Sequence, residues 1–312
     1  MASLPHGLSY AVGFDIGGTR IKAIALTERG ERLAECVAAT RDGEWVDGAP
    51  AFAWECRRIL QQWSDELGPA SAVGVAAPGV SAKNDRQIVF MVGRMQELVG
   101  FDFTAYFERS LLVPTLNDGQ AALVGEAWVG AAQGMRDVAL LTLGTGVGGA
   151  MMLDGRLIKG AFGRAGHFGH CCVDWNGTPG IFKTPGVVEN YIGNAGVPER
   201  SQGRFQDTRE LVEAVRAGEA MARTIWERGI RALACGIANI GNMIDPEAII
   251  IGGGIAEAGA ILWEPLEEAL EEVEWRPNGH RVRLIRPELT DWAGAYGAAR
   301  RAWQIASGQR LD

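Results

Sequence analysis

The sequence predicts an α/β protein that consists of two related domains. Apolar segments with the length of buried strands alternate along the chain with segments whose apolar residues have helical spacing. Two hairpins with glycine-rich turns, over 10–27 and 138–159, lie about half a chain apart, as expected of two related domains. The length of 312 residues also fits about two domains.

The first hairpin begins with an apolar strand and turns at residues 15–19, Asp-Ile-Gly-Gly-Thr. Apolar residues alternate through the returning strand, and a third strand follows over 33–38. Because Gly17 and Gly18 let backbone N–H groups approach an anion and the Thr19 hydroxyl adds a donor, the turn is a candidate phosphate site. For one hairpin alone, turn-forming glycines are an equally good explanation, but two such hairpins favour a functional one.

The central hairpin has a strand over 138–143, a turn over 144–149 and, after its second strand, a tight Asp154-Gly155 turn. Its glycines match the spacing G-x-G-x-x-G of dinucleotide-binding proteins, but that fold needs a helix directly after the turn. A strand follows here instead, which disfavours an NAD-dependent enzyme. The hydroxyl of Thr145 makes this turn a second candidate phosphate site.

The remaining elements of the N-terminal part follow in an order typical of helices packed on a mixed sheet. We expect a helix over 51–66, a strand over 72–77, a site-lining loop over 81–100, a helix over 103–110 and a strand over 111–116. The next long helix, over 118–132, contains small residues that allow close packing.

Asn117 and Asp118 stand at the start of that helix, and both residues are good N-caps. Capping alone is the simpler explanation of the aspartate. The alternative is that Asp118 acts as a general base at the end of a strand, because a helix N-terminus stabilises its carboxylate form. One aspartate can serve both purposes.

The C-terminal half contains the least regular segment, 161–196, which carries His167, His170 and the adjacent Cys171-Cys172. After it we expect helices over 207–217, 219–243, 259–273 and 293–306 and strands over 248–251 and 282–285. The first of these strands runs into Gly252-Gly253-Gly254, where a flat ring or a phosphate can approach the backbone, although three glycines alone indicate only a loop.

Composition narrows the range of partners. A net charge of -8 and a pI near 5.2 argue against nucleic acid or an anionic membrane as the main partner. No apolar run approaches the length of a membrane span, and residues 1–9 lack the features of a signal peptide. The five scattered cysteines, an odd number, fit reduced thiols, so we expect a cytoplasmic protein.

In this order the motifs resemble those of the ROK family of repressors and sugar kinases. The resemblance covers nearly the whole chain, and its motifs are residues 15–19 with Lys22, Ala77-Pro78-Gly79, Gly100-Phe101-Asp102, Asn117-Asp118, 143–149, Asp154-Gly155, Asp245-Pro246 and 252–255. It implies a two-domain actin-like ATPase (ribonuclease H-like) fold with an interdomain cleft, and a homodimer or homotetramer. The domains would be 1–116 plus about 293–312, and 117–292. Because the first strand is expected to start near residue 10, we do not expect the helix-turn-helix of the family's repressors.

The resemblance also implies ATP-dependent phosphorylation of a hydroxyl of a hexose or hexose derivative. Asp118 would be the base that takes the hydroxyl proton, and Asp15 would hold Mg²⁺ through water. The sugar would be bound by Asn117, Gly79, Arg94, His167, His170 and Glu189. ATP would be bound by Asp15, Gly17, Gly18, Thr19, Lys22, Gly144, Thr145, Gly146, Gly252, Gly253 and Gly254.

The segment 166–189 departs from the family pattern, in which a glutamate precedes a zinc-binding histidine and three cysteines. His167 stands in place of the glutamate, and Gly180, Phe182 and Val187 stand at the cysteine positions. A tetrahedral zinc site needs four good ligands, so we expect no structural zinc and a small apolar core instead. The weaker alternative is a zinc site rebuilt from the two histidines and two adjacent cysteines of this segment.

Two residues suggest which acceptor sugar the protein prefers. One is His167, and the other is Arg94, which stands where the family often has asparagine. Both can donate hydrogen bonds, so together they would favour an acceptor with a carboxylate, phosphate or other electronegative substituent. A solvated loop charge is an equally good explanation of Arg94. The same departures leave open a second function, that of a catalytically impaired protein that binds nucleotide or sugar.

Overall fold

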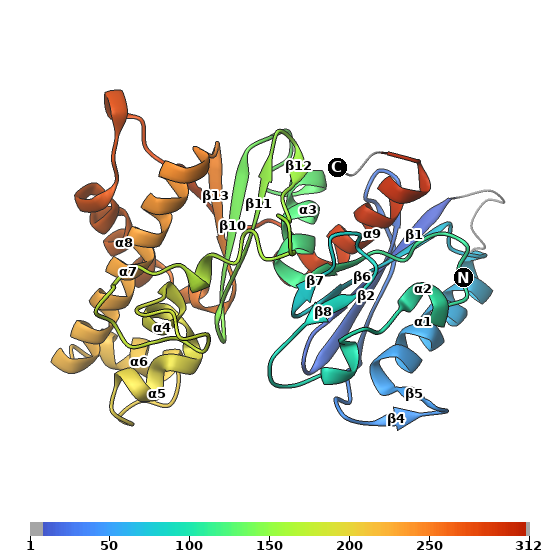
Figure 1. The fold of residues 1–312 in the computed structure, drawn as a ribbon, viewed down its shortest axis with the longest axis horizontal. Coiled ribbons are helices and arrows are strands. Elements are labelled where there is room, and N and C mark those ends of the chain that lie inside the picture. The colour runs from blue at the N-terminus through green and yellow to red at the C-terminus, as the bar shows by residue number, and fades with distance from the viewer. Residues whose placement is uncertain (1–8, 310–312) are drawn as a thin grey trace. The chain divides into compact units, whose positions relative to one another are not determined.

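The structure is a computed structural model that describes residues 9–309, and its contacts divide the chain into two compact units (Figure 1). Unit 1 contains the described chain up to Gly134, the segment Lys159–Ala165 and the chain from Glu288 onward. Unit 2 contains Met135–Ile158 and Gly166–Pro287. Each unit has a mixed five-stranded sheet that is covered by helices.

The sheet of unit 1 has the strand order β3-β2-β1-β6-β9. Strands β1, β2 and β3 are antiparallel neighbours, whereas β6 runs parallel to β1 and β9 parallel to β6. The bounds are Tyr10–Ile16 for β1, Arg20–Thr27 for β2, Arg32–Ala39 for β3, Ala72–Ala77 for β6 and Thr115–Asn117 for β9. Two short antiparallel pairs accompany it, β4 (Trp45–Val46) with β5 (Ala49–Pro50) and β7 (Val80–Ser81) with β8 (Ile88–Phe90).

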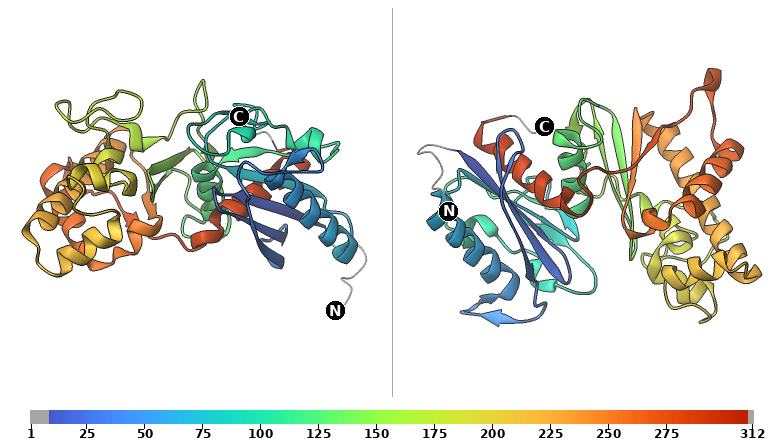
Figure 2. Two further views of the ribbon diagram at one scale, coloured as in Figure 1. Left: turned by 90° about the horizontal axis from the view of Figure 1, so that it is seen from below. Right: turned by 180° about the vertical axis from the view of Figure 1, so that it is seen from behind.

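Helices cover both faces of this sheet, because successive side chains of β1 point to opposite faces and those on both faces are buried. Tyr10 and the other even-numbered residues of β1 pack with the apolar side of α1 (Ala51–Leu67). The opposite face packs against α9 (Ala293–Ala306), the red helix of Figure 2. A Cβ on Gly13 would overlap the carbonyl O of Ala295, so glycine at this position lets the helix backbone rest directly on the strand.

Helix α3 (Asp118–Val129) belongs to unit 1, so the division of the chain differs from the expected boundary at Asn117. The reason is close packing of α3 against α9. A Cβ on Gly125 would lie 2.5 Å from the carbonyl O of Ala293, and a Cβ on Gly297 would overlap the backbone of α3. The small residues of α3 therefore fix this helix to the C-terminal helix, and the chain leaves unit 1 only after Gly134.

Unit 2 has the strand order β12-β11-β10-β13-β14. The strands are β10 (Val138–Leu143), β11 (Val147–Leu153), β12 (Arg156–Leu157), β13 (Ala248–Gly252) and β14 (Leu284–Ile285). The helices are α4 (Val188–Ile192), α5 (Val197–Arg200), α6 (Thr208–Arg216), α7 (Ala220–Ile244) and α8 (Ala260–Val273). One apolar core joins β10 and β13 to α4, α6, α7 and α8.

The largest differences from the expected elements lie before α3. The helix expected over 103–110 is α2 (Phe103–Tyr106), and Glu108 just beyond it has a φ of 54°, which no helix tolerates. The strand expected over 111–116 begins only at Thr115, because Pro114 has no N–H to donate to a neighbouring strand. The expected loop over 81–100 contains β8 and a 3₁₀ turn.

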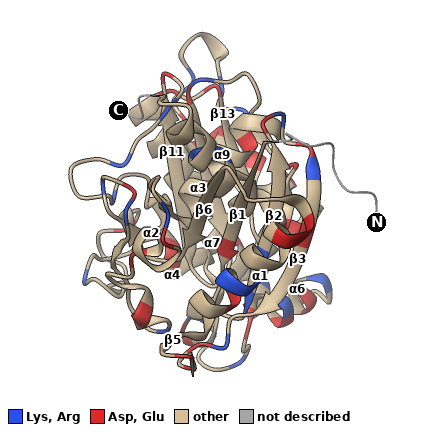
Figure 3. Ribbon diagram, turned by 90° about the vertical axis from the view of Figure 1, so that its right-hand side faces the viewer, with Lys and Arg blue, Asp and Glu red and all other residues tan. Residues whose placement is uncertain are grey.

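Charged residues of unit 1 lie mainly on its outer elements, such as α1 and β3, while β6 carries none (Figure 3). This distribution is the ordinary one of a sheet buried between helices. Within residues 9–309, none of the helices has both the length and the apolar character to cross a bilayer.

Candidate active site

Asn117 connects the end of β9, the start of α3 and the turn after β6. Its Oδ1 accepts hydrogen bonds from the backbone N–H groups of Gly119 at 3.0 Å and Gln120 at 3.3 Å, so Asn117 is the N-cap of α3. Its Nδ2 donates to the carbonyl O of Gly79 at 2.9 Å. Since Asn117 caps the helix, the side chain of Asp118 is not needed for capping.

Gly79 holds the other end of this connection. Its φ of +101° is open to glycine, and a Cβ there would lie 2.7 Å from the carbonyl O of Phe90 in β8. Only glycine therefore fits between the end of β6 and the β7–β8 pair. The predicted sugar-binding residues Asn117 and Gly79 are thus brought together by one hydrogen bond.

Asp118 is exposed, and its Oδ1 accepts a 2.8 Å hydrogen bond from the N–H of Gly119. Although the side chain contacts solvent, surrounding protein atoms displace water from the carboxyl and raise its pKa above the ordinary range, against the opposing effect of nearby donors. Asn117 already accepts the N–H groups of Gly119 and Gln120, so the cap does not depend on Asp118, and an accessible carboxylate of raised basicity suits a general base.

Asp15 at the end of β1 is the second acidic group of this region. Burial, and then the charge of Asp118, raise the pKa of the Asp15 carboxyl to about 7, while Lys22 acts in the opposite direction. Lys22 faces Asp15 across β1 and β2, and its ammonium donates to the carbonyl O of Asp291 at 2.7 Å and pairs with that residue's carboxylate at 3.3 Å. Asp15 therefore lacks a full counter-charge.

The turn from Gly17 to Thr19 is braced by its neighbours. The hydroxyl of Thr40 donates to the carbonyl O of Gly17 at 2.6 Å, and the N–H of Thr40 donates to the carbonyl O of Thr19 at 3.0 Å. Arg94 reaches the same turn and donates to the carbonyl O of Gly18 at 2.6 Å. The predicted phosphate turn and the loop that carries Arg94 are thus adjacent.

The Arg94 guanidinium also donates from Nε to Asp42 at 2.8 Å, and the side chain is 66% exposed. The other oxygen of Asp42 accepts the N–H of Met95 at 3.0 Å. Arg94 is therefore a solvated but ion-paired side chain at the phosphate turn, so Asp42 offsets much of the positive charge that it could present to an anionic sugar.

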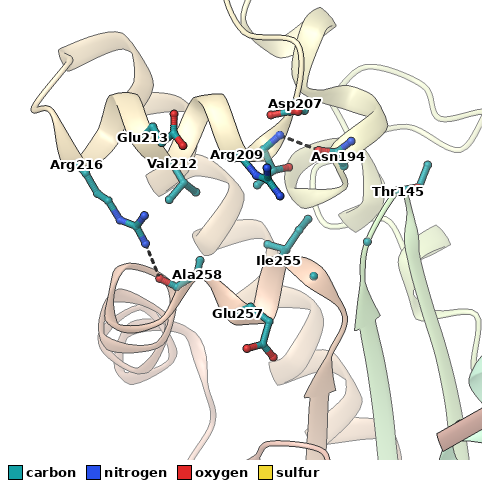
Figure 4. Close-up of a pocket in the computed structure, with 13 residues that line it drawn as sticks. Thr145, Asn194, Asp207, Arg209, Val212, Glu213, Arg216, Ile255, Glu257 and Ala258 are labelled. Carbon is teal, nitrogen blue, oxygen red and sulfur yellow. Dashed lines mark hydrogen bonds between the residues drawn. The ribbon is translucent and has the colours of Figure 1, made fainter. Parts of the chain in front are cut away.

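In unit 2 a cavity of about 470 Å³ opens beside the second glycine turn (Figure 4). It is lined by Gly144, Thr145, Asn194, Asp207, Thr208, Arg209, Val212, Glu213, Arg216, Gly254, Ile255, Glu257 and Ala258. Of the predicted ATP-binding residues of unit 2, Gly144, Thr145 and Gly254 line this cavity. Gly146, Gly252 and Gly253 do not.

Gly252 and Gly253 do not line the cavity, but their packing determines the position of Gly254, which does. A Cβ on Gly253, whose φ is +87°, would overlap the carbonyl O of Leu143, so this turn rests on the end of β10. Gly252 packs on Pro287. These two glycines bring Gly254 beside Gly144 and Thr145, which makes them residues that shape the site rather than line it.

Helix α6 supplies a wall that the sequence did not indicate. Asp207 caps α6 by accepting the N–H of Glu210 at 2.9 Å, and Asn194 accepts the N–H of Thr208 at 2.7 Å. These bonds place the first turns of α6 over the cavity (Figure 4). Asp207 begins the helix expected over 207–217, but only tertiary packing brings it to the glycine turn.

Glu189 lies against the second glycine turn, because its Oε2 accepts the N–H of Val147 at 2.8 Å and a Cβ on Gly146 would overlap its carboxylate.

His167 and His170 lie with nearly parallel rings at a centroid distance of 6.4 Å. Nε2 of His167 is buried and has no hydrogen-bond partner within the described chain. Burial, and then the charge of His170, lower the pKa of His167.

The segment expected to replace zinc is only partly apolar. Val187 is buried and pairs with Cys172 in a short bridge, but Phe182 is 46% exposed and meets the ring of His170 edge-on at 5.1 Å. The expected core of Phe182 and Val187 therefore involves only Val187. Throughout residues 9–309, no three side chains of His, Cys, Asp or Glu are grouped as a metal ion would require.

Comparison with known proteins identifies the class. The ROK family model matches residues 11–304, so the chain belongs to the ROK family. A glucokinase of Thermotoga maritima is 29% identical, over 92% of this chain and 95% of its own. These matches confirm the predicted family and the predicted class of enzyme, a sugar kinase.

Solved structures agree with the fold. A ROK hexokinase from Thermus thermophilus has a TM-score of 0.84 at 28% identity, over 96% of this chain and 99% of its own. A ROK glucokinase from Streptomyces griseus, in complex with glucose and AMPPNP, has a TM-score of 0.73 at 28% identity, over 95% and 100% of the two chains. The predicted actin-like α/β fold is therefore confirmed.

Proposed function

We propose that this protein transfers the γ-phosphoryl group of ATP to a hydroxyl of a hexose or hexose derivative, with Asp118 as the base. The observation that carries this proposal is that Asn117 and Asp118, although adjacent, have different roles. Asn117 caps α3 and binds Gly79, so Asp118 remains accessible for chemistry. Relatives named as glucokinase and hexokinase support the class of substrate.

In the proposed reaction, Asp118 accepts the proton of the sugar hydroxyl as that oxygen attacks the γ-phosphorus. The bond between the γ-phosphorus and the bridging oxygen of the β-phosphate breaks, and ADP leaves with the electron pair. Little covalent chemistry falls to the protein, so most of the rate enhancement comes from positioning and electrostatic stabilisation. Asn117 and Gly79 would orient the acceptor hydroxyls.

The cavity of unit 2 is the proposed nucleotide site. Its 470 Å³ suits a nucleoside, Gly144 and Thr145 present a glycine turn to phosphates, and Gly254 lets a flat ring approach the backbone. The carboxylates of Asp207 and Glu213 are suitable acceptors for ribose hydroxyls. The AMPPNP in the related glucokinase supports the use of ATP.

Asp15 is the residue proposed to hold Mg²⁺, through water. The fit is chemical, because a carboxylate is the usual protein ligand of Mg²⁺ and Asp15 is an incompletely compensated acid beside Asp118. Bound Mg²⁺ would supply charge neutralisation for the transferring phosphoryl group. In unit 1, Gly17, Gly18, Thr19 and Lys22 remain the proposed contacts to the phosphates.

For the acceptor, we propose a neutral hexose or hexose derivative. The lowered pKa of His167 makes this side chain an uncharged donor or acceptor at neutral pH, and Arg94 is already paired with Asp42. Neither observation supports a carboxylated or phosphorylated sugar. His167, His170 and Glu189 are the proposed hydroxyl-binding residues of unit 2.

The alternative function is that of a catalytically impaired protein that binds nucleotide or sugar. We favour an active enzyme because Asp15, Asn117, Asp118 and both glycine turns are intact. We further propose a cytoplasmic protein, in agreement with its five free thiols, and a homodimer or homotetramer as the family resemblance implies.

The test is ADP release with Mg-ATP over a panel of hexoses, amino sugars, N-acyl sugars and sugar acids. Asp118→Asn should lower kcat by about 10²–10⁴-fold because the amide cannot accept the proton, while ligand-induced shifts in melting temperature persist. Asp65→Asn, at an exposed position of α1, is the matched control. Unchanged turnover in Asp118→Asn would refute the assigned base. A wild-type protein that phosphorylates no sugar but is stabilised by ATP would establish the alternative.

A further inference from the structure

A buried cluster of charges lies in unit 1, apart from the proposed reacting groups. The carboxylate of Asp85 pairs with the ammonium of Lys159 and with the guanidinium of Arg301, whose Nε donates to it at 2.7 Å. The three side chains are only 2%, 7% and 7% exposed. Burial of an unpaired charge is costly, and here the carboxylate of Asp85 offsets part of that cost for both cations.

These three residues come from distant parts of the chain. Asp85 is in the turn between β7 and β8, Arg301 is in α9, and Lys159 begins the segment 159–165, which we call the strap. The chain leaves unit 2 at Ile158, runs as the strap on unit 1 and returns to unit 2 at Gly166. Lys159 is thus the charged anchor of a segment whose two ends both continue into unit 2.

A second contact fixes the strap beside the acceptor residues. Gly163 has a φ of +81°, and a Cβ there would overlap the carbonyl O of Ser81 in β7. The Ser81 hydroxyl bonds to the side chain of Gln120 in α3 at 2.8 Å, with both residues buried. β7 directly follows Gly79, so the strap rests on the segment that the Gly79–Asn117 hydrogen bond holds.

The strap also limits where His167 can be. His167 follows Ala165 by two residues, so their Cα atoms lie at most about 7.6 Å apart in any arrangement of the chain. Ala165 is held by its N–H, which donates to the carbonyl O of Lys159 at 3.2 Å. Fixing Lys159 therefore fixes the point from which the His167 segment starts.

We propose that the Asp85–Lys159–Arg301 cluster is an anchor whose function is to hold the strap on unit 1 and so position His167 for the acceptor sugar. Lys159 is a positioning residue, since it acts through the strap. The assignment of His167 to the sugar rests on the proposed function, whereas the anchoring of the strap is independent of that function.

Two variants show whether the cluster positions the strap or only stabilises the fold. Lys159→Met and Arg301→Met each remove one cation and leave Asp85 with one remaining partner, so each keeps a neutral buried pair. Only Lys159→Met releases the strap. If the cluster serves stability alone, both variants should lower the melting temperature and behave alike in every other assay.

The first readout is tryptic cleavage after Arg164, an exposed residue of the strap, followed by mass spectrometry of the native protein. Since Lys159→Met removes a charge-assisted hydrogen bond that holds the strap, cleavage should accelerate about tenfold or more in this variant. It should stay within about twofold of wild type in Arg301→Met, because that substitution leaves the strap anchored.

The second readout is steady-state kinetics with the best sugar of the panel. Lys159→Met should raise the KM for the sugar about tenfold, with the KM for ATP nearly unchanged, whereas Arg301→Met should alter neither. Equal cleavage and equal KM values in the two variants would overturn the proposal. If wild-type protein phosphorylates no sugar, the cleavage arm still decides the anchor, and only the proposed function fails.

A glycine pair tests the strap without touching the buried charges. Gly163→Ala forces a side chain against Ser81, whereas Gly155→Ala, at a similar positive φ of 74°, meets open space. The backbone strain is thus matched, and only Gly163→Ala should reproduce the faster cleavage after Arg164. Wild-type cleavage in Gly163→Ala would contradict the docking of the strap, even if Lys159→Met failed to fold.

Discussion

At the residue scale, Asn117 makes two structural contacts through different atoms of its side chain. Its Oδ1 caps α3, whereas its Nδ2 holds the carbonyl O of Gly79. A serine keeps the cap but cannot make the second bond, because its hydroxyl stands on a shorter side chain. The cap and the acceptor geometry can therefore be measured independently.

We expect Asn117→Ser to retain wild-type stability within about 0.5 kcal/mol and to lose most sugar kinase activity. Asn117→Ala should lose the activity and also about 1 kcal/mol of stability, because the cap disappears as well. Chemical unfolding and the ADP-release assay measure the two effects. Equal stability of the serine and alanine variants would contradict the capping role.

Asp15 gives a pH dependence whose sign follows from its surroundings. Its pKa is raised from an ordinary 3.8 to about 7, so between these values the folded state keeps a proton that the unfolded state has lost. The stability contributed by this group is present at low pH and falls as pH rises towards 7. An ionised Asp15 destabilises the protein without bound metal.

Asp15→Asn should therefore stabilise the protein without Mg²⁺ at pH 8, by an amount on the order of 2–4 kcal/mol, and have little effect near pH 4. Melting temperatures of wild type and variant across this range provide the measurement. A variant that is less stable than wild type at every pH would show that the carboxylate is compensated in the native state.

At the element scale, the glycines of the turn after β13 have different structural roles. Gly253 has a positive φ and rests on Leu143, whereas Gly254 has open space around its Cα and lines the cavity. Three consecutive glycines in the sequence thus have different roles. The distinction arises from the neighbouring strand β10, which the local sequence does not contain.

Gly253→Ala should cost about 1–3 kcal/mol of stability and weaken AMPPNP binding, because the turn must move away from β10. Gly254→Ala should fold with wild-type stability, which makes it the matched control for stability, although not for binding. Thermal melting distinguishes the two variants, and calorimetric titration with AMPPNP measures the loss of binding in Gly253→Ala. Equal melting temperatures would contradict the packing of Gly253 on Leu143.

At the scale of the whole molecule, the chain passes between its units four times. It leaves unit 1 after Gly134, returns for the strap, leaves again after Ala165 and returns at Glu288. Along the chain, the strap is therefore joined to the central hairpin at one end and to the His167 segment at the other.

The glycine hairpins, the helix over 293–306 and the Asn117-Asp118 pair could be predicted from the sequence, because each depends on local turn chemistry, helical spacing or capping. The family and the class of enzyme were likewise predicted from motif order. The hairpins, the helix and the cap need only residues that are close together in the chain, and the order of the motifs can be followed directly along the sequence.

Other features depended on tertiary structure. The place of α3 in unit 1 depends on its contacts with α9, between Gly125 and Ala293 and between Ala121 and Gly297, which are 168 and 176 residues apart in the chain. The role of α6 at the cavity, the pairing of Arg94 with Asp42 and the Asp85–Lys159–Arg301 cluster likewise join distant segments. Local sequence specifies turns and caps, whereas the partner of a buried charge or a packed helix is chosen only when the chain has folded.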